Sequence, residues 1–394
     1  MSKRCDAILT VNERERLRRD DLSRSDAGGG YVYDNQWRVR GLRDGRRSIR
    51  QTWSPCPKSD ALAPVRPLKL SMRPFAPSLV TILLLAAASA VFAQDKGTLK
   101  HHTLPPLANP DDPKTPAKEL FGRKVGPTAK PTHVVGFYAS GCLDGAVALP
   151  INGEAWQVMR LSRNRNWGHP ELIHFLEGLG TKVAKAGTWR GLLVGDMSQP
   201  RGGPMITGHA SHQVGLDADI WLTPMPPRKL TPAEREEMSS TMVVADDRRD
   251  VDPRVWTPGH FAVIKAAASD PLVQRIFVNP AIKKALCREA GSDRAWLEKV
   301  RPWWGHDYHF HVRLRCPGDS PECKPQPPAG GGDGCGKELN SWFTEAVLHP
   351  KPSSKPDKAR PGKPMSSLPP ACAQVLAAPD AHTVGAALDR GAVR

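Results

Sequence analysis

Residues 308–315 have the sequence YHFHVRLR, in which apolar and polar side chains alternate. Successive side chains of a β-strand point to opposite faces, so this pattern predicts a strand with one apolar and one polar face. His309 and His311 then lie side by side on the polar face, which Arg313 and Arg315 continue. The strand therefore presents two imidazoles that point the same way.

A second alternating stretch, residues 216–222, has the sequence LDADIWL and follows the segment GHASHQVG at residues 208–215. Asp217 and Asp219 share its polar face, and His212 lies in the turn that leads into it. We expect this strand and the strand at 308–315 to aim their polar groups at a common point.

These residue types are those of a divalent-metal site. A catalytic zinc ion takes three protein ligands and leaves one position open for water. We therefore expect His212, Asp219 and His311 to bind Zn2+, with Asp217 as the weaker alternative to Asp219. His309 is then free to act as a general acid and base, because an imidazole titrates near neutral pH.

The remaining periodicities predict a mixed fold. Apolar spacing predicts an amphipathic helix at 170–185, and Thr-Pro pairs at 231–232 and 257–258 begin two more helices. A short apolar run predicts a strand at 192–194. Because strands and helices interleave without βαβ regularity, we expect an α+β fold with a small central antiparallel sheet, flanked by helices and long loops, in a single disulfide-stapled domain.

The chain is strongly basic. The chain of 394 residues has a net charge of +16, and residues 1–93 contribute half of it with 17 Lys+Arg against 9 Asp+Glu. A basic remainder suits an anionic partner such as a cell wall, although it also fits an ordinary solvated surface. No finger spacing, basic heptad or aromatic–basic strand motif indicates a nucleic-acid partner.

Residues 72–93 combine a basic start, an apolar core and small residues before Gln94, which is typical of a secretory signal peptide. The apolar run is shorter than the roughly 20 residues that span a bilayer, so we expect no stable membrane span after cleavage. We expect periplasmic export from Met72. The expected segments are an over-extended, disordered leader at 1–71, the signal peptide at 72–93, a flexible lead-in at 94–134, the enzyme domain at 135–345 and a Pro/Lys-rich tail at 346–394.

Six cysteines follow the signal peptide, and an even number in a secreted chain indicates disulfides. They are Cys142, Cys287, Cys316, Cys323, Cys335 and Cys372. Six cysteines allow 15 pairings. A structural zinc cluster is the alternative, but the sequence has no Cys-x-x-Cys pair.

Four motifs resemble the penicillin-insensitive murein endopeptidases, a zinc peptidase family grouped with lysostaphin-type enzymes and D-Ala-D-Ala metallopeptidases. They are GHASHQVGLD at 208–217, FVNPAIK at 277–283, VRPW at 300–303 and HVRLRCP at 311–317. The resemblance runs from about residue 137 to 343, with Cys372 beyond it. It implies a periplasmic hydrolase of the D-alanyl–meso-diaminopimelyl cross-links of peptidoglycan, with disulfides Cys142–Cys372, Cys287–Cys335 and Cys316–Cys323.

The resemblance also implies roles for single residues. It makes His212, Asp219 and His311 the primary zinc ligands, and His309 and His306 active-site histidines. It further associates three residues with metal, the last two at a second site: His209, Asp247 and Asp250. At the position of Asp250 the family usually has a histidine, which this chain replaces with a carboxylate, a hard ligand.

Two other functions compete with this interpretation. A D,D-carboxypeptidase would use the same chemistry to trim a terminal D-alanine from stem peptides. A non-catalytic cell-wall or metal-binding module would keep the fold and the ligands, but it needs no spare imidazole such as His309. The sequence does not indicate an oligomeric state.

Overall fold

The computed structural model describes residues 32–33, 39–40, 104–349 and 362–381. The chain divides into two units, Met1–Ser78 and Leu79–Arg394. In the first unit, β1 (Val32–Tyr33) pairs with β2 (Val39–Arg40) in antiparallel fashion. The expected signal peptide and the rest of the leader lie outside the described residues. Among the helices that the structure describes, none is both long and apolar enough to cross a membrane.

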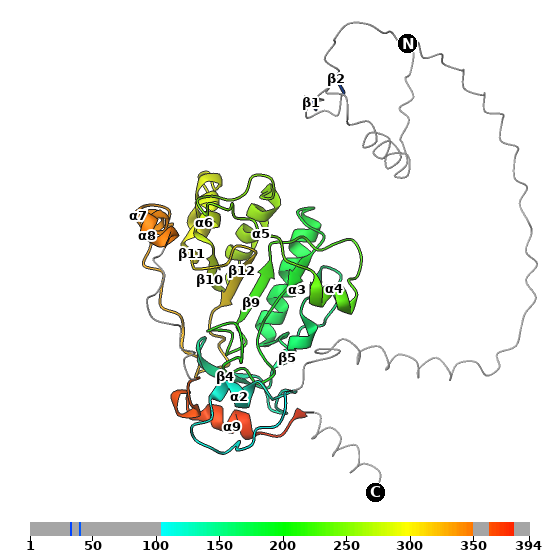
Figure 1. The fold of residues 1–394 in the computed structure, drawn as a ribbon, viewed down its shortest axis with the longest axis vertical. Coiled ribbons are helices and arrows are strands. Elements are labelled where there is room, and N and C mark those ends of the chain that lie inside the picture. The colour runs from blue at the N-terminus through cyan, green and yellow to red at the C-terminus, as the bar shows by residue number, and fades with distance from the viewer. Residues whose placement is uncertain (1–31, 34–38, 41–103, 350–361, 382–394) are drawn as a thin grey trace, which may run out of the picture. The chain divides into compact units, whose positions relative to one another are not determined.

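The second unit is built on a six-stranded sheet with the order β11-β10-β12-β9-β8-β6 (Figure 1). The strands are β6 (Trp156–Val158), β8 (Leu192–Val194), β9 (Asp217–Trp221), β10 (Val273–Val278), β11 (Val300–Pro302) and β12 (His309–Leu314). The strands expected from the alternating stretches, β9 and β12, are antiparallel neighbours near the middle of this sheet.

The sheet is mixed, so our expectation of an antiparallel sheet is wrong at both edges. β6 pairs with β8 in parallel, and β10 pairs with β11 in parallel. Parallel neighbours need a crossover connection. Helix α3 (Pro170–Lys185) lies between β6 and β8 in the chain, and α6 (Pro280–Glu289) lies between β10 and β11. The α+β class itself is confirmed.

The three helices that we predicted begin where the sequence places them. Proline occupies the first turn of α3, α4 (Pro232–Glu237), α5 (Pro258–Ala268) and α6, where its missing N–H costs nothing. The capping residue of α4, Thr231, accepts a hydrogen bond from Glu234 N, and the Glu234 carboxylate accepts one from Thr231 N. These local signals explain why the predicted helix starts are correct.

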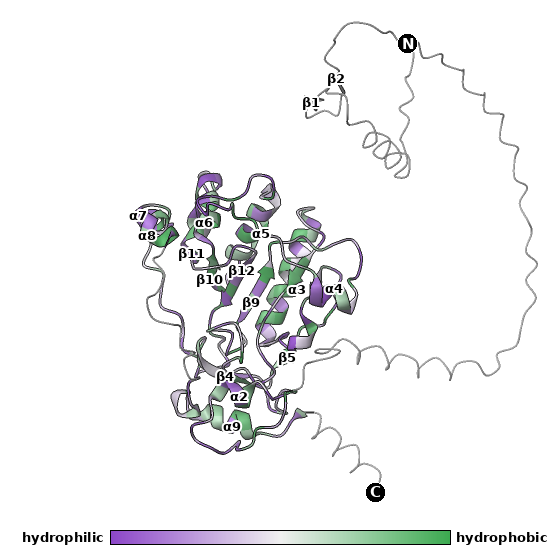
Figure 2. Ribbon diagram, in the orientation of Figure 1, coloured by the Kyte–Doolittle hydropathy of each residue, from purple (hydrophilic) through white to green (hydrophobic). Residues whose placement is uncertain are grey.

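One face of the sheet packs into the main hydrophobic core. Ala218, Ile220, Phe310 and Val312 are fully buried there with apolar side chains of α3, α5 and α6. The opposite set of side chains on β9 and β12 is polar. Figure 2 shows hydrophilic residues of β9 and β12 in the middle of this unit. The sheet therefore buries a polar face as well as an apolar one.

Residues 104–133, which we expected to be flexible, hold α2 (Ala117–Phe121) in a second apolar cluster. Phe121 packs there with Cys142, Cys372 and Val375. Figure 1 shows α2 beside β4 (Ser140–Asp144) and the C-terminal helix α9 (Ala371–Ala377). The apolar side chains of α2 and the Cys142–Cys372 bond thus bring both ends of the domain together.

The smaller elements connect these parts. They are β3 (His133–Phe137), β5 (Val147–Ala148), η1 (Leu161–Arg163), β7 (Trp167–Gly168), η2 (Ala295–Lys299), α7 (Lys337–Asn340), η3 (Ser341–Phe343), α8 (Glu345–Leu348) and η4 (Met365–Ser367). The three disulfides implied by the resemblance are confirmed: Cys142–Cys372, Cys287–Cys335 and Cys316–Cys323.

The disulfides close loops of very different length, and this predicts different contributions to stability. Cys142–Cys372 spans 230 residues, whereas Cys316–Cys323 spans 7. Loop-closure entropy predicts that the Cys142→Ala/Cys372→Ala variant loses about 3 kcal/mol more unfolding free energy than the Cys316→Ala/Cys323→Ala variant. Urea unfolding of the oxidised proteins measures this difference, and equal losses would contradict the prediction.

Candidate metal centre

The pairing of β9 with β12 assembles the centre. His309 lies opposite Trp221, His311 opposite Asp219, and Arg313 opposite Asp217. Directly opposed residues on antiparallel strands share a face, and their Cβ atoms are about 5 Å apart. The polar side chains predicted on two separate strands therefore meet on one face.

Three ligand atoms converge there with the spacing of a metal site. His212 Nε2 is 3.1 Å from His311 Nδ1 and 3.4 Å from Asp219 Oδ1, and the latter two atoms are 3.2 Å apart. Atoms about 2.0–2.1 Å from a tetrahedral zinc ion are separated by about 3.3 Å. Asp219 Oδ1 is buried and has no hydrogen-bond donor among the described residues, so a cation fits the donor set.

His212 is held in an unusual backbone conformation. Its φ of +66° lies in the left-handed region, which non-glycine residues adopt at a cost. Its backbone N–H donates to Asp217 Oδ2 at 2.9 Å, and its side chain is fully buried. Gly215, at φ +70°, permits the turn because a Cβ there would lie 2.4 Å from Leu143. The turn thus aims His212 inward.

The two carboxylates of β9 have different partners. Asp217 is bound by Arg313, through Nε at 2.8 Å and Nη2 at 3.1 Å, whereas Asp219 faces histidines. Burial alone would raise the pKa of Asp217, but Arg313 and His311 outweigh it and hold the pKa well below its usual range. Both oxygens of Asp217 therefore accept hydrogen bonds, whereas Asp219 Oδ1 has no donor among the described residues.

His209 lies next to this group. Its Nε2 is 3.1 Å from Asp196 Oδ2 and 3.5 Å from Asp219 Oδ2, and its ring centroid is 4.3 Å from that of His212. His209, His212 and Asp219 each offer a ligand atom within 4.8 Å of the others, so these residues can hold a metal ion.

Asp196 is a site residue that the sequence reasoning missed. It is buried and also accepts hydrogen bonds from Arg165 and Arg163. Burial raises the pKa of Asp196, but the bond from His209 and the two arginines outweigh this effect and hold the pKa well below its usual range. Its position two residues after the apolar run at 192–194 is a weak sequence signal.

His309 and His306 complete the group. His309 Nε2 is 3.6 Å from Asp219 Oδ1, and the rings of His306 and His309 are 4.8 Å apart. Burial lowers the pKa of His309, and burial with the charges of His309 and His311 lowers the pKa of His306 to about 3. Both imidazoles are therefore neutral at neutral pH. His306 Nδ1 donates to the carbonyl of Trp304 at 2.7 Å.

The structure does not bring Asp247 and Asp250 into contact with these histidines. Asp247 accepts a hydrogen bond from the backbone of Arg249. Asp250 forms ion pairs with Arg288 at 2.9 Å and Lys284 at 3.3 Å. The negative charge of Asp250 is therefore compensated by two basic side chains, Arg288 and Lys284.

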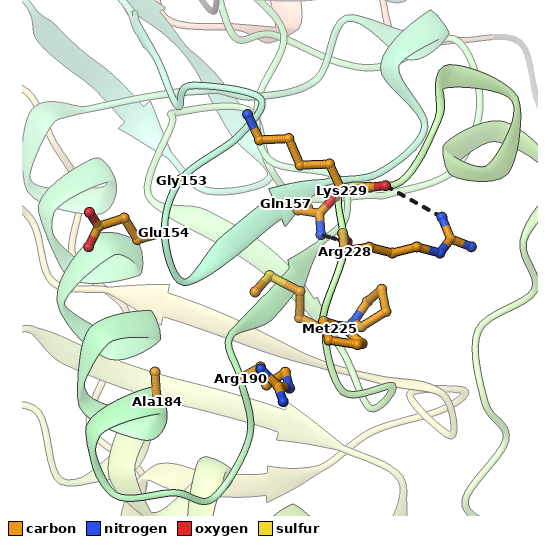
Figure 3. A pocket seen from close by; sticks show the side chains of 10 residues that line it. Gly153, Glu154, Gln157, Ala184, Arg190, Met225, Arg228 and Lys229 are labelled. Carbon is orange, nitrogen blue, oxygen red and sulfur yellow. Dashed lines mark hydrogen bonds between the residues drawn. The ribbon is translucent and has the colours of Figure 1, made fainter. Parts of the chain in front are cut away.

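A separate pocket of about 480 Å³ lies between the end of α3 and the proline-rich loop 224–228 (Figure 3). None of its lining residues is a histidine. Arg228 in its wall is paired with Glu234, and Gln157 donates to the Arg228 carbonyl at 2.9 Å. The reactive side chains therefore gather at the β9–β12 face and not in this pocket.

Comparison with known proteins agrees with the geometry. The family model described as penicillin-insensitive murein endopeptidase matches residues 134–377. A Haemophilus influenzae protein of that name is 50% identical over 246 residues, covering 62% of this chain and 83% of its own length. Proteins of the same name from Escherichia coli O1:K1 and E. coli SMS-3-5 are 47% identical over 251 residues, covering 64% of this chain and 87% of theirs. The resemblance seen in the sequence is confirmed: the chain belongs to the penicillin-insensitive murein endopeptidase family.

Proposed function

We propose that this chain is a zinc-dependent endopeptidase that hydrolyses the D-alanyl–meso-diaminopimelyl cross-links of peptidoglycan. The observation that carries the proposal is the convergence of His212 Nε2, Asp219 Oδ1 and His311 Nδ1 within 3.1–3.4 Å of one another. The relatives named murein endopeptidases support the choice of substrate.

His212, Asp219 and His311 would hold the zinc ion, with His209 beside them. The Lewis acidity of a bound zinc ion supplies two effects, the acidification of water and the polarisation of a peptide carbonyl. Histidine and carboxylate ligands with one open position are the donor set of zinc hydrolases.

His309 would move the proton. It is neutral at neutral pH, and its Nε2 points towards the carboxylate ligand Asp219. In our proposal His309 Nε2 accepts the proton of the attacking water and returns it to the leaving amine. His306, neutral with its Nδ1 proton bound to the carbonyl of Trp304, would position His309 or the substrate through its free Nε2.

The surroundings of the centre suit a polymeric substrate. Trp303 and Trp304, next to His306, are 52% and 51% exposed. Exposed aromatic side chains next to a reactive centre indicate a surface that contacts a partner. We propose that stem peptides of the cell wall cross this surface.

A second ion at Asp247 and Asp250 would need a rearrangement. Asp250 would have to exchange its ion pairs with Arg288 and Lys284 for a metal. We therefore centre the proposal on one ion.

We propose that the protein acts in the periplasm after cleavage of a signal peptide at residues 72–93, with residues 135–345 as the catalytic domain. Three disulfides support an oxidising compartment. The substrate supports the same location, because murein lies outside the cytoplasm.

Purified muropeptides test the activity. We expect the enzyme to convert cross-linked dimers to monomers, because the bond it cuts joins two stem peptides. A chelator should abolish the conversion and added zinc should restore it, with chromatography of the products as the readout. Release of free D-alanine from monomers would identify a carboxypeptidase, and no product of either kind would support the non-catalytic module.

Two histidine variants separate metal binding from proton transfer. His309→Ala should keep zinc but slow dimer hydrolysis about 100- to 10,000-fold, the usual contribution of a general acid–base group. His311→Ala should lose both zinc and activity. Metal analysis and initial rates give the two readouts, with His174→Ala, an exposed histidine on α3, as the control. Unchanged hydrolysis in His309→Ala would refute the assignment of the proton acceptor.

A further inference from the structure

We propose that Asp217 is a positioning residue that sets the ring orientation and the tautomer of His311 and, at the same time, holds the backbone of His212. The inference rests on the metal ligands of the proposed function but not on its substrate. It gives Asp217 a role distinct from that of Asp219, the other carboxylate of the LDADIWL stretch.

The hydrogen bonds of the Asp217 carboxylate come from the His212 backbone and from Arg313. Oδ2 accepts from His212 N at 2.9 Å and from Arg313 Nη2 at 3.1 Å. Oδ1 accepts from Arg313 Nε at 2.8 Å and faces His311 Nε2 at 3.2 Å. An asparagine in this place would turn its NH2 group against donors in either orientation, so only a carboxylate satisfies the site.

This arrangement decides which nitrogen of His311 is free. His311 Nε2 lies 3.2 Å from Asp217 Oδ1 and has no hydrogen-bond partner among the described residues. In our proposal the proton on Nε2 is directed to Asp217, so that Nδ1 directs its lone pair towards His212 Nε2 and Asp219 Oδ1. A carboxylate that holds the far nitrogen of a metal-binding histidine fixes its tautomer and raises its basicity. The same carboxylate holds His212, whose backbone would otherwise be free to leave the left-handed conformation at φ +66°.

Asp217 itself is rigidly held. Its side chain is fully buried, and its counterion Arg313 donates to Gln326 Oε1 at 2.6 Å. The Arg313 guanidinium lies 4.1 Å from the ring centroid of Tyr138 and 5.2 Å from that of Phe277. A carboxylate fixed in this way can transmit its geometry to two ligands.

A buried ion pair with only a structural role is the competing explanation, and zinc affinity separates the two. We expect Asp217→Asn in the full-length protein to bind zinc about 10- to 100-fold more weakly than the wild type in competition with a chelator. Asp144→Asn is the matched control, because Asp144 is also buried, pairs with Lys130 and accepts a bond from Thr128. The control should lose stability without losing affinity.

A folded Asp217→Asn protein with wild-type zinc affinity would overturn the proposal. Should this variant not fold, 15N NMR of the histidines in the metal-free wild type decides, with His311→Gln assigning the signal. At alkaline pH we expect a proton on His311 Nε2 and none on Nδ1, and the opposite tautomer would also overturn it. Neither readout uses substrate, so a failure to cut muropeptides would refute the proposed function and leave this inference intact.

Discussion

The antiparallel register of β9 against β12 is the constraint on which the site depends. It sets His311 opposite Asp219 and Arg313 opposite Asp217. Because the side-chain period of a strand is two residues, a slip of one residue would turn these groups into the apolar core and bring Phe310 and Val312 to the polar face. The hydrophobic face of the same two strands therefore protects the geometry of the centre against such a slip, because it would take buried side chains such as Ala218 and Ile220 out of the core.

Two buried carboxylates so close together would repel each other unless each had a positive partner. The fold reduces this repulsion by giving the two carboxylates different partners. Asp217 receives the fixed charge of Arg313 and a backbone N–H, whereas Asp219 receives only imidazoles. The Asp217 carboxylate is thus used for structure, and Asp219 keeps an oxygen without a hydrogen-bond donor among the described residues. This asymmetry between neighbouring aspartates on one strand face leaves a carboxylate oxygen that could bind a metal ion.

The rest of the domain supports this face from a distance. Helices α3 and α6 cross over between parallel edge strands and cover the apolar side of the sheet. The Cys142–Cys372 bond and the α2–α9 cluster join segments from both ends of the domain. Such remote links reduce the freedom of the unfolded chain and so stabilise a centre whose own groups are costly to bury.

Local sequence determined the parts of the site, because helix caps, alternation and turn residues act over a few neighbours. The strands β9 and β12, the helix starts and the shared face of His309 and His311 follow from such signals. Tertiary structure decided what no local pattern encodes. His212 and His311 are 99 residues apart in the sequence, and Asp196 reaches the site from the end of another strand. The edge strands β6 and β11 have three residues each, too few for the sequence to predict whether they pair in parallel or antiparallel fashion. These contacts depend on how distant segments pack, so they could only be read from the folded chain.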